Sequence, residues 1–78
     1  FSADDIDLLL QLPQINFIIA GGHDGTVYKL SIGTGRRTVD NNLYAEYNII
    51  KDSGASPHEI VEKMARKYGW RYERVEAK

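Results

Sequence analysis

The chain of 78 residues can build one small hydrophobic core, and its 42% hydrophobic and 27% charged residues are typical of a globular domain. It has no cysteine, which excludes a disulfide framework and a thiolate metal site, and no apolar run approaches the roughly 20 residues that span a bilayer. The net charge of −1 argues against broad affinity for nucleic acid. We expect one compact domain over residues 1–78, located in the cytoplasm and without a membrane partner. Because the chain begins with Phe1 rather than Met, we also expect it to be processed or cut from a longer protein.

A short helix is predicted over residues 3–11. Ser2 is a suitable N-cap, and acidic residues follow in the first turn, where the helix dipole favours negative charge. Apolar residues recur on one face at helical spacing: Ile6, Leu9 and Leu10. Since Leu8 and Leu12 widen this stripe, we expect the helix to pack by most of its circumference and to end before Pro13.

Two runs rich in β-branched and aromatic residues follow, at 15–20 and 26–32. The glycine-rich segment 21–25 separates them, so together they predict a β-hairpin. In the second run, the apolar side chains that point the same way are Tyr28, Leu30 and Ile32. This alternation is typical of a sheet with one covered face and one partly wet face.

Residues 33–42 lack apolar periodicity and are predicted to form a loop, whereas residues 43–51 fit two structures. A helix capped by Asn41 or Asn42 would place three apolar side chains on one face: Leu43, Tyr47 and Ile50. A strand would suit the two tyrosines and two isoleucines of the segment. By a narrow margin we predict a strand, with the helix as the alternative.

The clearest predicted element is a helix over residues 57–68. Ser56 and Glu59 form a capping box, Pro57 occupies the first helical position, and Gly69 provides the stop. A single apolar stripe runs along it: Ile60, Val61, Met64, Ala65 and Tyr68.

Residues 70–75 indicate a final strand with charged residues on one face, at a sheet edge. The element order is therefore α-β-β-(β or α)-α-β. We predict a small α+β fold, in which an antiparallel sheet of three or four strands is covered on one face by two helices.

The loop Gly33–Arg37 is the most suggestive polar feature. Its glycines would let backbone N–H groups approach an anion, and Arg36 and Arg37 could clamp phosphate oxygens. Neither a Walker pattern nor Gly-x-Gly-x-x-Gly is present, and an exposed turn with solubilising arginines would look the same. The other candidate binding residues are basic or aromatic: Lys63, Arg66, Lys67, Trp70, Arg71, Tyr72 and Arg74.

Two observations give these other candidates an ordinary structural explanation. Glu62 precedes Arg66 by four residues, the spacing of a solvated helix face laced with ion pairs. Trp70 fits a residue of the core or rim that closes the sheet.

Catalysis and metal binding have little support. His23 and His58 each stand beside a carboxylate, which could in principle supply an acid–base pair or metal ligands. No metal-ligand spacing and no Gly-x-Ser-x-Gly motif is present, and the two histidines suit a turn and a helix terminus. We expect no enzymatic activity, no cofactor and no metal.

Two functions fit these observations. The first is a small non-catalytic module that binds another protein or a second copy of itself, as an adaptor, an inhibitor or a homodimer. It would act through an exposed sheet edge or through Tyr44, Trp70 and Tyr72, because aromatic residues anchor interfaces. The second is nucleic-acid or phosphate binding by the loop Gly33–Arg37 and the basic residues of 57–74. The mixed charge favours the first.

Overall fold

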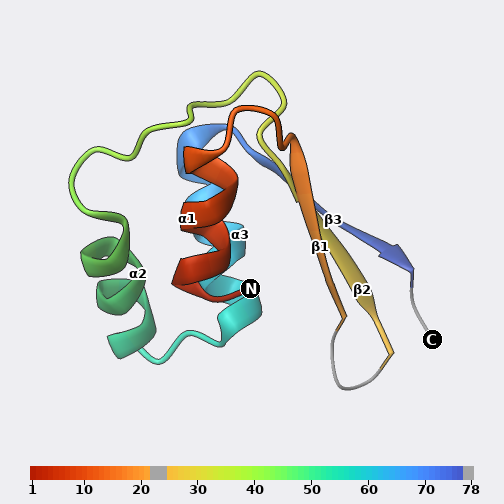
Figure 1. Cartoon of the computed structure of the whole chain (residues 1–78). Coiled ribbons are helices and arrows are strands. Elements are labelled where there is room, and N and C mark those ends of the chain that lie inside the picture. The colour runs from red at the N-terminus through yellow and green to blue at the C-terminus, as the bar shows by residue number, and fades with distance from the viewer. Residues whose placement is uncertain (22–24, 77–78) are drawn as a thin grey trace.

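The computed structural model describes residues 1–21 and 25–76, which form three helices and a three-stranded antiparallel sheet (Figure 1). The elements in chain order are α1 (Ala3–Gln11), β1 (Phe17–Gly21), β2 (Val27–Ser31), α2 (Leu43–Asp52), α3 (Pro57–Tyr68) and β3 (Arg71–Glu76). All three helices lie on the same side of the sheet in Figure 1. The predicted small α+β fold is therefore confirmed, and most of the predicted hairpin turn lies outside the described residues.

The strand order is β1-β2-β3, and both pairings are antiparallel. β2 is thus the central strand, and β3 forms one edge of the sheet, as predicted for the last strand. On β2, Leu30 faces the helices between Ile18 of β1 and Tyr72 of β3. The core lies between this face and the helices and contains the following buried residues: Ile6, Leu9, Leu30, Ile32, Leu43, Tyr47, Ile60, Val61, Met64, Ala65, Tyr68 and Trp70.

The predicted helix over 57–68 is confirmed with the same bounds. The hydroxyl of Ser56 accepts the N–H of Glu59 at 3.3 Å, and the Glu59 carboxylate accepts the N–H of Ser56 at 3.2 Å. At the other end Gly69 adopts φ +77°, a left-handed conformation that glycine tolerates and that ends the helix.

The helix over 3–11 is also confirmed, with Ser2 and Asp5 forming a capping box. We expected this helix to pack by most of its circumference, and Leu8 departs from that expectation. Ile6 and Leu9 are buried, whereas the side chain of Leu8 is 50% exposed. Leu8 lines a groove beside β1, so this flank of α1 is open.

The strand predicted over 43–51 is wrong, because this segment is the helix α2. The side-chain Oδ1 of Asn42 accepts the N–H of Ala45 at 3.1 Å and caps the helix, and Gly54 follows its end with φ +95°. Leu43 and Tyr47 face the core, whereas Ile49 is 71% exposed. Capping and burial of one helical face thus outweigh the sheet preference of the tyrosines and isoleucines. α2 packs on α1 and α3, and these two helices cover the sheet on one face, as predicted.

Candidate functional site

Arg37, a predicted phosphate ligand, forms hydrogen bonds within the fold. Its guanidinium donates to the main-chain carbonyls of Leu9 at 3.2 Å, Pro13 at 3.4 Å and Ile15 at 3.2 Å. These hydrogen bonds tie the end of α1 to the segment that leads into β1. Since a charged donor gains more from a hydrogen bond than a neutral one does, Arg37 fixes the local path of the chain.

Gly35, another residue of the predicted phosphate loop, is explained by close packing. A Cβ atom placed there would lie 2.6 Å from the carbonyl oxygen of Gly69 and 2.8 Å from that of Tyr68. The N–H of Arg36 donates to the same Tyr68 carbonyl at 3.0 Å. The glycine therefore allows the loop to lie against the end of α3.

Arg36 and Lys67 are the predicted basic residues that the fold brings together. Both cations lie over the ring of Tyr68, at 5.3 Å and 5.2 Å from its centre. Arg36 pairs with Asp40 at 2.8 Å and so lowers the pKa of that carboxyl, and Lys67 pairs with Glu46 at 3.2 Å, a hydrogen bond that raises the pKa of Lys67. Each base is thus matched by an acid.

Trp70, predicted either as a stacking platform or as a core residue, is buried. Its ring stacks on Tyr68 with centroids 5.2 Å apart, and its indole N–H donates to the carbonyl of Arg36. Trp70 is therefore a core residue beneath the loop Gly33–Arg37, which agrees with the prediction of a core or rim position.

The remaining basic candidates are dispersed. Lys63 and Arg66 lie on the outer side of α3, where Arg66 pairs with Glu62 at 3.0 Å. On β3, Arg71 pairs with Ser31 and Arg74 with Tyr28, so these two side chains lie on opposite faces of the sheet. The described residues therefore do not bring these bases to one surface.

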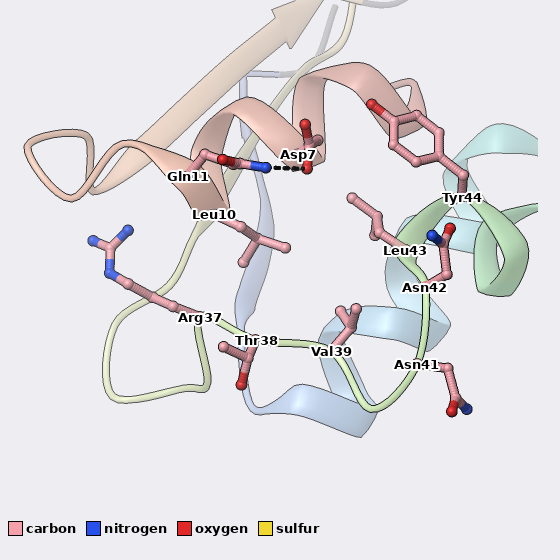
Figure 2. A pocket seen from close by; sticks show the side chains of 10 residues that line it. All are labelled: Asp7, Leu10, Gln11, Arg37, Thr38, Val39, Asn41, Asn42, Leu43 and Tyr44. Carbon is pink, nitrogen blue, oxygen red and sulfur yellow. Dashed lines mark hydrogen bonds between the residues drawn. The ribbon is translucent and has the colours of Figure 1, made fainter.

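A hollow of about 550 Å³ lies between α1 and residues 37–44. Its apolar side chains point toward one another in Figure 2: Leu10, Val39 and Leu43. Asp7 and Gln11 on its rim are joined by a hydrogen bond of 3.2 Å, and Arg37 points away toward the carbonyls that it binds. The rim therefore offers one carboxylate and no free base to a ligand.

Tyr44, a predicted aromatic anchor, also lies on this rim (Figure 2). Its hydroxyl donates to the carboxylate of Asp4 at 2.8 Å, and this hydrogen bond is the main reason why the pKa of Tyr44 rises to about 12. The phenol is thus a link between α1 and α2.

Of the two candidate histidines, His23 lies outside the described residues. His58 is placed beside Tyr72, with its Nδ1 2.9 Å from the phenol oxygen, and its Nε2 lies 3.4 Å from a carboxylate oxygen of Glu62. Its ring also lies 4.9 Å from that of Tyr28, centroid to centroid. Residues 1–21 and 25–76 contain no group of three His, Cys, Asp or Glu side chains that could hold a metal ion.

The outer edge of β1 presents backbone groups that the sheet does not use. Ile32 donates its N–H to the carbonyl of Asn16 at 3.2 Å, which fixes the alternation of the antiparallel ladder. Hydrogen bonds to β2 therefore involve the even-numbered residues, and the N–H and C=O groups of Phe17, Ile19 and Gly21 point outward. Within the described part of the chain, β1 pairs only with β2.

The side chains of this edge are apolar. β1 has the sequence Phe-Ile-Ile-Ala-Gly and contains no charged residue. Phe17 and Ile19 are 47% and 56% exposed, on the face of the sheet away from the helices. The Lys29 ammonium of β2 lies 4.6 Å from the centre of the Phe17 ring, next to this strip. An uncharged, exposed edge strand is a template for pairing with another chain.

A groove of about 220 Å³ runs along the other side of this edge, between α1 and β1. The side chains of its lining residues are apolar apart from one carboxylate: Phe1, Asp5, Leu8, Ile18, Ile19 and Ala20. Leu8, whose side chain is half exposed, is one of these lining residues. Outward backbone groups thus lie between an apolar strip on one face and an apolar groove on the other, and we define the outer edge of β1 with this groove as the β1 site.

The sequence supports an exposed sheet edge in general terms, but it does not identify β1 or Leu8. One usable signal is the absence of charge from residues 15–20, since edge strands usually carry charged side chains. The other signal is Leu8, because the helix 3–11 already has enough apolar residues for one buried stripe without it. Neither signal reveals that the two meet.

The comparisons with known proteins found no matching family model, no matching curated protein and no matching solved structure. In the structure over 1–21 and 25–76, no helix combines the length and the apolar character that crossing a bilayer requires.

Proposed function

We propose that this protein is a small, non-catalytic interaction module that binds an extended segment of another protein at the β1 site. The observation that carries the proposal is an uncharged edge strand whose outward N–H and C=O groups lie beside an apolar groove. Addition of a strand to a sheet edge is a common mode of peptide recognition, in which backbone hydrogen bonds supply affinity and alternating side-chain contacts supply specificity.

The two sides of the edge suit the two faces of an added strand. Its side chains would alternate between the open face, where they meet Phe17 and Ile19, and the groove, where they meet Leu8 and Ile18. Apart from Asp5 in the groove and Lys29 beside Phe17, the side chains on both sides are apolar, so apolar side chains on the partner would lose contact with water on both faces.

The alternative function, nucleic-acid or phosphate binding, has weaker support. Arg37 donates to three carbonyls, Arg36 is paired with Asp40, and Lys67 is paired with Glu46. Phosphate-driven binding needs bases that converge and are free to neutralise the phosphates.

The test is selection of binding sequences from a library of displayed extended peptides, followed by affinity measurements with two variants. Ile19→Lys introduces a charge at the β1 site, and we expect it to weaken binding at least about tenfold, or about 1.4 kcal/mol. Ile49→Lys is the matched control, because Ile49 is an exposed isoleucine on α2, away from the sheet.

The expected result is that the selected peptides shift the backbone amide resonances of residues 17–21 and lose affinity only for Ile19→Lys. Equal affinity for Ile19→Lys and the unmodified protein would show that binding occurs elsewhere and would overturn the proposal.

A further inference from the structure

The charge around the β1 site constrains what the partner strand carries. Residues 1–21, which form α1 and β1, contain Asp4, Asp5 and Asp7 and no basic side chain. Of these acids, Asp5 lines the groove itself. Lys29 lies on the opposite face of the sheet, over the Phe17 ring. Among the side chains that line the groove, the only charge offered to an incoming strand is therefore the Asp5 carboxylate.

The Asp5 carboxylate can accept a partner's cation. Its Oδ2 accepts the N–H and the hydroxyl of Ser2, both at 3.1 Å, as part of the α1 cap. No hydrogen bond to Oδ1 is present among residues 1–21 and 25–76. The side chain is exposed, so Oδ1 can be reached from the groove. Phe1 also lines the groove, and its ring lies edge-on to that of Tyr72, with centroids 6.1 Å apart.

The spacing along the groove sets the position of that cation. Figure 1 shows α1 and β1 running in opposite directions, so Asp5 lies toward the Ala20 end of β1 and Leu8 toward the Ile18 end. Asp5 and Leu8 are separated by about 4.5 Å of helix rise, and alternate residues of a strand by about 6.7 Å. A long basic side chain spans the difference, so one strand can satisfy both contacts with residues two positions apart.

We infer that the partner of the β1 site is an extended apolar segment with a lysine or arginine placed to face Asp5, two residues before a large apolar residue that faces Leu8. This inference rests on the proposed function and specifies the partner's chemistry. The order follows from antiparallel addition, which continues the pairing of the whole sheet. In such a strand the open-face residues lie opposite Gly21, Ile19 and Phe17, and the groove-facing residues lie opposite Ala20 and Ile18.

The probe is a set of three capped peptides, Thr-Val-X-Val-Leu-Val-Thr, with Lys, Gln or Glu at X. We expect the Lys peptide to bind about three- to fivefold more tightly than the Gln peptide, the Glu peptide to bind most weakly, and the preference to shrink with added salt. Binding is measured by titration calorimetry, and its location by the amide resonances of residues 17–21.

Two protein variants assign the preference to Asp5. Asp5→Asn keeps a side-chain oxygen for the α1 cap and removes the charge, so it should abolish the preference for Lys over Gln. Asp7→Asn is the matched control, because Asp7 is on the same helix but lines the hollow on its other flank, and it should keep the preference.

Each other outcome overturns a different statement. If the three peptides bind equally at residues 17–21, the basic partner is wrong and the proposed function stands. If none of them, and no peptide from the displayed library, perturbs residues 17–21, the proposed function itself fails. If sedimentation shows a dimer that Ile19→Lys dissociates, the occupant is a second copy of the chain, and the inferred basic segment is wrong.

Discussion

The two edges of the sheet differ sharply although both pair with β2. β3 has the sequence Arg-Tyr-Glu-Arg-Val-Glu, whereas β1 has the sequence Phe-Ile-Ile-Ala-Gly. Charged side chains on an edge strand oppose pairing with other chains, and their absence permits it. The difference indicates that β3 is protected against association and that β1 is available for it.

The helices reinforce this contrast. On the helix-facing side of β3, Tyr72 contacts His58 and stacks on Tyr28, with ring centroids 5.4 Å apart. Beside β1 the corresponding space is a groove, because Leu8 leaves half of its surface exposed there. The site therefore follows both from the sequence of the strand and from where α1 is held.

The largest expected effect tests which backbone groups of β1 point outward. Ile18→Pro removes an N–H that bonds to β2 and disturbs a side chain that packs on the core, so it should cost about 3 kcal/mol or more of unfolding free energy. Ile19→Pro removes an outward N–H and should cost about 1 kcal/mol. Urea denaturation followed by Trp70 fluorescence measures both. Equal losses would contradict the assigned ladder.

The next effect concerns the hydrogen bonds that hold the approach to β1. Arg37→Met leaves three carbonyls without their donor and should lower the free energy of unfolding by about 2–3 kcal/mol. Arg36→Met is the matched control and should cost clearly less, because its ion pair with Asp40 is exposed on both sides. Similar losses in urea denaturation would show that Arg37 does not have this structural role.

A smaller effect, on self-association, is expected when the charged edge strand β3 is made to resemble the uncharged edge strand β1. Arg71→Val with Glu73→Val removes two charges from the open face of β3, and we expect stronger self-association with little change in fold. Ile19→Lys should have the opposite effect at β1. Light scattering across a protein concentration series measures both variants, and an unchanged onset of association in both would mean that edge charge does not control it.

The smallest effect is the contribution of Tyr72, on β3, to the pH dependence of stability. Burial is the main cause that raises the pKa of Tyr72 to about 12 from its usual 10.0. The folded protein thus holds this proton more tightly than the unfolded chain does. The resulting stability is fully present below pH 10 and is lost as the pH rises toward 12. Tyr72→Phe should therefore lose less stability than the unmodified protein between these pH values, as measured by urea midpoints, and parallel curves would refute this.

Local sequence signals predicted the elements that local interactions determine. The capping box at Ser56 and the left-handed stop at Gly69 bound α3 as expected, because both act within one turn of the helix. Residues 43–51 were predicted as a strand because Tyr and Ile prefer sheets, but burial of Leu43 and Tyr47 against other helices decided the outcome. Such packing is not visible in the segment itself.

The candidate site depends on contacts between distant residues, which local sequence does not reveal. Arg37 binds a carbonyl 28 positions away, at Leu9, and Gly35 packs against the backbone of Gly69. An arginine and a glycine with these roles have the same local sequence as a phosphate loop. The groove likewise exists only because the fold sets Leu8 beside Ile18.

Amide hydrogen exchange of β1, measured by NMR with and without the Lys peptide, tests the central claim most directly. In the free protein, the amides of Ile18 and Ala20 should exchange slowly and those of Phe17, Ile19 and Gly21 quickly, because only the even-numbered amides bond to β2. At saturating peptide we predict that the three outward amides become protected as well. If they exchange at the free-protein rate while the peptide is bound, no strand has been added to β1, and the proposed mode of binding is wrong.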